Sequence, residues 1–62
     1  MILVNAAKCM YCYEIVESKW VHDFNTCSCG NLSVDGGLDY IRRAFVDREW
    51  IEMSVEIGID GD

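Results

Sequence analysis

The chain has 62 residues, of which 52% are hydrophobic and 26% are charged, with eleven Asp and Glu, five Lys and Arg, and four Cys. So short a chain forms a single domain over residues 1–62, and because its core supplies only about 3–5 kcal/mol, we expect a disulfide, a metal or a partner subunit to complete the fold. The formal charge of −6 disfavours direct binding to nucleic acid or to an anionic membrane and favours a partner with a basic surface.

The N-terminal residues predict the compartment. No basic region precedes their apolar run, which is much shorter than the core of a signal peptide or a transmembrane helix. We therefore expect a cytoplasmic protein, whose thiols glutathione and thioredoxin keep reduced. In that setting, paired cysteines indicate a metal site more readily than a disulfide framework.

The first two thirds of the chain predict short strands. Residues 13–16 alternate briefly between apolar and charged side chains, and a polar loop separates them from a second short strand that contains Phe24. Further on, residues 32–34 and 38–41 flank Asp35-Gly36-Gly37. Glycine readily adopts the positive φ of a tight turn, so these two segments predict a hairpin.

The last third allows two interpretations. Leu38, Ile41 and Phe45 have helical spacing, so residues 38–49 are either helix or strand. Residues 50–59 alternate with the period of a half-buried strand, and we favour a long C-terminal strand there. Residues 46–49 would then turn the chain back onto a strand at 40–45.

The C-terminal alternation also predicts self-association. It puts a long apolar row on one face of the strand, comprising Ile51, Met53, Val55, Ile57 and Ile59. This row is longer than so small a fold can cover, and an apolar terminal strand offers an edge for pairing. We therefore expect a homodimer built on residues 50–59, in which Glu52 and Glu56 on the other face limit open-ended stacking.

The cysteines carry the strongest chemical signal. Cys9 and Cys12 form C-x-x-C, Cys27 and Cys29 form C-x-C before Gly30, and fourteen residues separate the pairs. Two such pairs brought together by a hairpin surround one tetrahedral ion, in the Cys₄ geometry typical of structural zinc. We predict one zinc ion per chain, with Gly30 in a tight turn where backbone N–H groups approach the sulfurs.

Several alternatives to zinc remain open. Iron in a rubredoxin-like site has the same tetrahedral preference and would make the protein an electron carrier. Disulfides or four separate buried thiols would also use the cysteines. The single histidine, His22, stands beside Asp23 between the pairs and fits a solvated or carboxylate-paired turn better than a ligand.

Two pairs of other residues could carry function. Arg42 and Arg43 face opposite ways on a strand, which favours ion pairing with Glu52 or Glu56 and leaves an anion or nucleotide contact as the alternative. Trp20 and Trp50 are hard to bury in so small a fold and, beside acidic residues such as Glu52 and Glu56, suit a protein-binding surface. We expect Tyr13 and Phe24 to cover the metal site and fill the core.

Part of the sequence resembles small zinc-ribbon-like proteins encoded by bacteriophages and some bacteria. The resemblance rests on Lys8-Cys9-x-x-Cys12, Ile15-Val16-Glu17-Ser18, His22-Asp23-Phe24, Cys27-x-Cys29-Gly30 and the stretch from Val34 to Arg43. It covers over half of the chain and ends at Arg43. It implies a phage accessory setting and a metal site, and it implies no catalytic activity.

Together these observations predict a small, mainly β zinc ribbon with a metal-clasped hairpin, a second hairpin and a long C-terminal strand. The expected function is non-enzymatic: an acidic phage protein that binds and inhibits a host defence or nucleic-acid-processing protein. The alternative is an anti-defence protein that sequesters a small nucleotide signal with Arg42, Arg43 and an aromatic side chain. No nucleophile and base pattern of an enzyme is present in the sequence.

Overall fold

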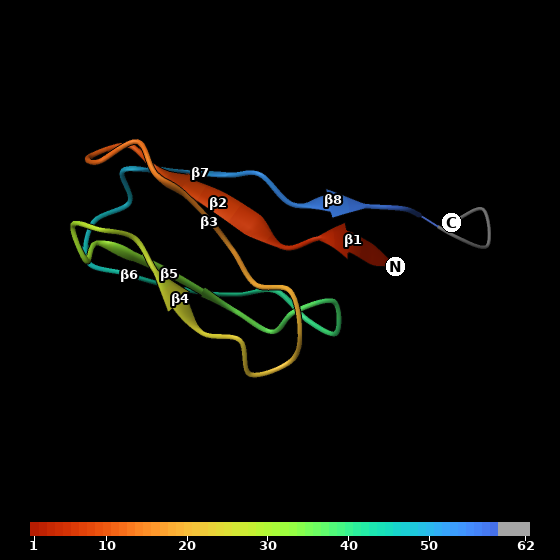
Figure 1. Cartoon of the computed structure of the whole chain (residues 1–62). Coiled ribbons are helices and arrows are strands. Elements are labelled where there is room, and N and C mark those ends of the chain that lie inside the picture. The colour runs from red at the N-terminus through yellow and green to blue at the C-terminus, as the bar shows by residue number, and fades with distance from the viewer. Residues whose placement is uncertain (59–62) are drawn as a thin grey trace.

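The computed structural model describes residues 1–58, which form short strands joined by turns and contain no helix (Figure 1). Consequently, nothing in this part of the chain could cross a membrane as a helix. The strands are β1 (Ile2–Val4), β2 (Ala6–Cys9), β3 (Ile15–Glu17), β4 (Asn25–Thr26), β5 (Leu32–Asp35), β6 (Arg42–Phe45), β7 (Trp50–Glu52) and β8 (Val55–Glu56).

The strands pair into three small antiparallel sheets. One three-stranded sheet has the order β3-β2-β7, the other has the order β4-β5-β6, and β1 and β8 form a separate two-stranded ribbon. In Figure 1 the two larger sheets face each other, and the β1-β8 ribbon extends away from them beside the N-terminus. The prediction of a small, mainly β, zinc-ribbon-like fold is confirmed.

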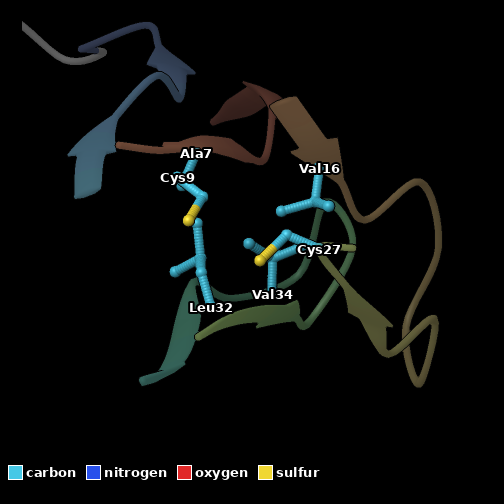
Figure 2. Packing of buried hydrophobic residues seen from close by; sticks show 6 residues of the cluster. All are labelled: Ala7, Cys9, Val16, Cys27, Leu32 and Val34. Atoms are coloured by element: carbon cyan, nitrogen blue, oxygen red, sulfur yellow. The ribbon is translucent and has the colours of Figure 1, made fainter. Parts of the chain in front are cut away.

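The core lies between the two three-stranded sheets. Figure 2 shows its side chains converging from both layers. One sheet supplies Ala7, Cys9 and Val16, and the other side supplies Cys27, Leu32 and Val34. Only two of these six residues, Leu32 and Val34, are large aliphatic side chains with no exposed surface. Two cysteines therefore belong to the core, and the metal site is continuous with it.

The second hairpin is confirmed, but its loop is longer than predicted. β5 pairs with β6 in a register that joins Asp35 to Arg42, so the loop comprises residues 36–41 and the second strand starts at Arg42 rather than at Leu38. Gly36 and Gly37 both have positive φ, 108° and 56°. A Cβ on Gly36 would lie 1.9 Å from the Tyr40 carbonyl oxygen, which shows how tightly the loop folds back.

The prediction for the C-terminal third is wrong in its pairing. Residues 46–49 do not return the chain to β6; they carry it to the other sheet, where Trp50 lies opposite Cys9 on β2. Asn31 directs this crossing, because its side-chain amide donates to the Asp47 carbonyl at 3.1 Å and its oxygen accepts the Asp47 N–H at 2.8 Å.

The predicted long strand is also divided in two. β7 ends at Glu52 and pairs with β2, whereas β8 begins at Val55 and pairs with β1. The break coincides with Ser54, whose hydroxyl accepts the Ala6 N–H at 3.1 Å. Ile59, the last member of the predicted row, lies outside the described residues.

Two aromatic side chains expected in the core are exposed instead. Tyr13 has a left-handed backbone conformation with φ of 61°, and its ring is exposed, with the Lys8 ammonium over it at 5.6 Å from the centroid. Phe24 is likewise exposed, at the start of the edge strand β4. Trp50 and Phe45 pack against the core in their place, with ring centroids 5.3 Å apart.

Buried polar groups close the end of the sandwich away from the cysteines. Asn5 has no exposed surface, and its side-chain amide donates to the carbonyls of Asp35, Gly37 and Tyr40 at 2.8–3.1 Å. The Ser18 hydroxyl donates to the Asp23 carbonyl and accepts the Gly37 N–H, at 2.7 and 2.8 Å. Because buried polar groups are costly unless hydrogen-bonded, these bonds fix two loops to each other and to the start of β2.

Candidate metal centre

Both cysteine pairs lie at turns of antiparallel hairpins. Cys9 ends β2 and Cys12 lies in the turn toward β3, whereas Cys27 follows β4 and Cys29 lies in the turn toward β5. Since the two hairpins belong to facing sheets and turn at the same end of the body, the pairs meet there (Figure 1). The fold therefore assembles one site from residues up to twenty positions apart.

The sulfur positions fit a single tetrahedral ion. All four Sγ atoms lie within 4.8 Å of one another, and Cys29 Sγ is 3.4 Å from Cys9 Sγ and 3.5 Å from Cys27 Sγ. Metal–sulfur distances of about 2.3 Å require sulfur separations of about 3.8 Å in a tetrahedron. All four residues are free thiols in this structure. The arrangement has the donor type, number and spacing that a thiophilic divalent ion requires.

Backbone hydrogen bonds shape each turn. The Cys9 N–H donates to the Glu14 carbonyl at 2.9 Å and the Cys27 N–H to the Leu32 carbonyl at 2.9 Å, so both turns are closed in the same way. The Tyr11 N–H approaches Cys9 Sγ at 3.4 Å. Gly30, with φ of 81°, donates its N–H to the Cys27 carbonyl rather than to a sulfur. Gly30 thus lies in a tight turn, as expected, and its positive φ allows that turn.

The thiols of the site differ in pKa. Burial raises the pKa of Cys27, but the Leu32 N–H and the neighbouring thiols outweigh it and lower the pKa to about 6. The Asn31 N–H lowers the pKa of Cys29, but burial and the neighbouring thiols raise it to about 12. One sulfur ionises readily while another retains its proton, because four negative charges cannot accumulate together. A divalent cation would relieve this repulsion and displace the remaining proton.

A side-chain contact outside the sulfurs joins the two turns. Glu14, from the first turn, accepts hydrogen bonds from both the N–H and the hydroxyl of Ser28 in the second turn, the former at 2.7 Å. The Ser28 hydroxyl and N–H hold the pKa of Glu14 below its usual value. Glu14 therefore remains ionised at neutral pH and acts as a clasp between the turns. The spacing of the cysteines gave no indication of it.

The site is exposed on one side only. Cys9 and Cys27 are buried in the core, Cys12 is half-buried and Cys29 is exposed. An ion held here would lie at the boundary between core and solvent. His22 is exposed in the loop between β3 and β4, where its carbonyl accepts the Phe24 N–H, and it is not among the clustered donor groups.

The two tryptophans differ in exposure. Trp20 is 63% exposed, as expected for a surface anchor. Trp50 is half-buried against the core, opposite Cys9, and its Nε1 is a buried donor without a partner within residues 1–58. The alternation of the C-terminal segment correctly places Trp50 on the face of Glu52 and Ser54. At Trp50 this face turns toward the core, since Trp50 lies opposite the buried Cys9, whereas Glu52 is exposed.

The two arginines also have different surroundings. Arg43 donates to the Glu52 carboxylate at 2.9 and 2.5 Å, to the Ser54 hydroxyl at 2.8 Å and to the Ala6 carbonyl at 3.1 Å. Its side chain is only 7% exposed, and its guanidinium is engaged by groups of this chain. Arg42 is exposed and lies over the Tyr40 ring at 5.6 Å. Glu56 is exposed on β8.

A model of a domain of unknown function, DUF7695, matches residues 1–45. The chain belongs to this family. The matched part contains all four cysteines, Asn5 and both clasped turns, but it stops before β7 and β8, which complete two of the sheets. No curated protein and no solved structure matches the chain.

Proposed function

We propose that this member of the DUF7695 family is a non-enzymatic zinc protein of the cytoplasm whose acidic molecule binds another protein through an exposed aromatic surface. Following the resemblance of its motifs to phage-encoded zinc-ribbon-like proteins, we further propose a phage accessory protein. Its target would be a host defence or nucleic-acid-processing protein with a basic surface.

The observation that carries the proposal is a rigid apolar surface at the end away from the cysteines. Trp20 and Val21 on one loop, and Leu38 and Tyr40 on the other, are all exposed. Gly37 packs so closely under Trp20 that a Cβ there would lie 2.1 Å from the Trp20 backbone. Because Trp and Tyr are enriched among interface anchors, and a fixed loop loses little entropy on binding, this surface suits protein recognition.

Charge favours a basic partner. The chain carries −6 as written, and four thiolates with one divalent ion would change this to −8. Such a charge steers a basic surface toward the molecule and speeds its association. The metal supports this role without chemistry of its own, since four thiolates fill a tetrahedral shell and leave no position for a substrate.

The test is affinity capture from host lysate with the zinc-loaded protein, with and without nuclease, followed by mass spectrometry. We expect capture of one enriched protein. Its capture should persist after nuclease treatment, be lost in 0.5 M salt and fall at least about tenfold with Trp20→Ala. Tyr13→Ala, which removes an equally exposed aromatic near the metal end, is the control and should leave capture unchanged. Capture that is abolished by nuclease, or equal for both variants, would contradict the proposal.

A further inference from the structure

We propose that two copies of this chain associate through the free edge of β8, in an antiparallel pairing centred on Val55. The starting observation is the ribbon formed by β1 and β8, which extends beyond the two facing sheets (Figure 1). A two-stranded ribbon is marginally stable in water unless a further strand or layer packs on it. Within residues 1–58, β8 has β1 as its one hydrogen-bonded neighbour.

The ribbon is apolar where it is exposed. Exposed hydrophobic side chains occur along both of its strands and the adjoining residues: Met1, Leu3, Met53, Val55 and Ile57. A strand edge that joins exposed apolar side chains to free backbone groups is a template for pairing with another chain. Every folded molecule has this exposed ribbon, and a second copy of the chain is present wherever the protein is. A second copy is therefore the partner that we propose to pair with it.

The distribution of charge also favours a second copy of the chain, rather than a basic partner, at this ribbon. The chain carries −6, so two copies repel each other over most of their surface. In residues 1–4 and 53–57, however, Glu56 is the one ionisable side chain, and the Met1 ammonium, which donates to the Ile57 carbonyl at 3.0 Å, offsets its charge. Like-charged copies can approach most closely at this nearly uncharged ribbon. A basic partner, in contrast, would gain little from binding here.

The sequence of the edge is self-complementary. Met53 and Ile57 donate their N–H groups inward, to Ala6 and Met1, at 2.9 and 2.8 Å. By the alternation of a strand, Glu56 then directs its backbone groups toward the free edge, and Ser54, in the break before β8, would do the same once the pairing extends β8 by one residue. In an antiparallel pairing centred on Val55, each Ser54 exchanges both backbone hydrogen bonds with Glu56 of the second copy.

The same register places compatible side chains opposite each other. Val55 meets Val55 of the second copy, Met53 meets Ile57, and Glu56 meets the uncharged Ser54. The two Glu56 carboxylates are thereby kept from lying directly opposite each other, which would be destabilising. The result is a closed, two-fold symmetric dimer with a continuous four-stranded sheet of the order β1-β8-β8-β1.

The experiment is sedimentation equilibrium of the zinc-loaded protein at micromolar concentrations. We expect twice the chain mass of 7.1 kDa. Val55→Glu should weaken the dimer at least about tenfold, because it places two glutamates directly opposite each other at the axis, with Cβ atoms about 5 Å apart. Val46→Glu, at an 80% exposed position in the loop between β6 and β7, is the control and should leave the dimer intact.

Charge reversal tests the register. Val55→Glu and Val55→Lys should each dimerise at least about tenfold more weakly than the wild type and should form a heterodimer when mixed in equal amounts, because residue 55 of one copy lies opposite residue 55 of the other. The wild-type dimer should tighten when salt is raised, since salt screens the repulsion between like-charged copies. Zinc content and circular dichroism show whether each variant is folded. A wild-type protein that remains monomeric, or a mixture without heterodimer, would overturn the proposal.

Discussion

Arg43 extends from β6 toward the other sheet, where it meets Glu52 on β7 and the Ala6 carbonyl on β2. Burial alone raises the pKa of Glu52, but the Arg43 guanidinium and the Ser54 hydroxyl outweigh this and hold the pKa below its usual value. A bidentate guanidinium–carboxylate contact is stronger than a simple surface pair. One of the five basic residues of the chain is therefore used to join the two sheets.

The first prediction concerns this ion pair. Arg43→Met should lower the free energy of unfolding of the zinc-loaded protein by about 1 kcal/mol at pH 7, a modest value because Glu52 is 42% exposed and solvent screens the pair. The contribution is complete above the unfolded pKa of about 4.3 and is lost as pH falls through the lowered folded pKa. Urea denaturation measures the change.

Arg42→Met is the matched control for this prediction. It removes the neighbouring arginine, which is exposed and lies over a tyrosine ring, and should change the free energy of unfolding by less than about 0.5 kcal/mol. Equal effects of the two substitutions would show that the pair with Glu52 does not join the sheets.

Two elements, the turns after β2 and after β4, form the metal site, and a contact between their side chains joins them. Glu14 accepts two hydrogen bonds from Ser28, one of them from the backbone next to Cys27 and Cys29. Groups just outside the ligands orient a metal site and affect its affinity. The clasp therefore holds the two cysteine turns against each other in the folded protein.

The second prediction is that loss of this clasp weakens metal binding. Glu14→Ala should lower zinc affinity about tenfold, the lower end of the range for such supporting groups, because the turns must then be ordered by the ion alone. Competition with a chromogenic chelator measures the affinity. Glu17→Ala removes an exposed carboxylate from β3, away from the turns, and should leave the affinity within about twofold. An unchanged affinity in the Glu14 variant would contradict the role of the clasp.

The whole molecule has a very small core that includes two of the candidate ligands. Within residues 1–58, the large aliphatic side chains that are completely buried are Leu32 and Val34, and Cys9 and Cys27 fill the space beside them. The polar contacts of Asn5 and Ser18 hold one end of the sandwich, and the cysteine turns form the other. Because the core alone is marginal for 62 residues, we expect the binding energy of the metal to appear as folding energy.

The third prediction is that zinc and the fold are lost together. Elemental analysis of the reduced protein should find one zinc per chain, and the protein should lack the visible colour of iron bound by four thiolates. A strong chelator should abolish the circular dichroism spectrum of the fold. As pH is lowered, protons compete with the ion for the sulfurs, and release should occur below the pKa of about 6 of Cys27 because the ion stabilises its thiolate. An unchanged spectrum after complete metal removal would contradict the prediction.

The sequence alone determined the features that depend on local pattern. The spacing of Cys9, Cys12, Cys27 and Cys29 predicted four clustered thiols, since close pairs at turns can point at one centre whatever the rest of the fold does. Gly36 and Gly37 predicted the hairpin between β5 and β6 because a positive φ is a local requirement. Within β7, the alternation correctly predicted that Trp50 and Glu52 share a face, opposite Cys9 and Ala7 on β2.

Only the tertiary structure decided which strands meet and which face is covered. Residues 50–52 pair with β2 rather than with β6, so Trp50 turns toward the core while the row from Ile51 to Ile57 faces outward. Alternation cannot predict this, because it has the same period whichever face is buried. The contacts of Arg43, Asn5 and Glu14 likewise join residues between 9 and 37 positions apart. Their partners are fixed by the packing of two sheets, which leaves no local signal in the sequence.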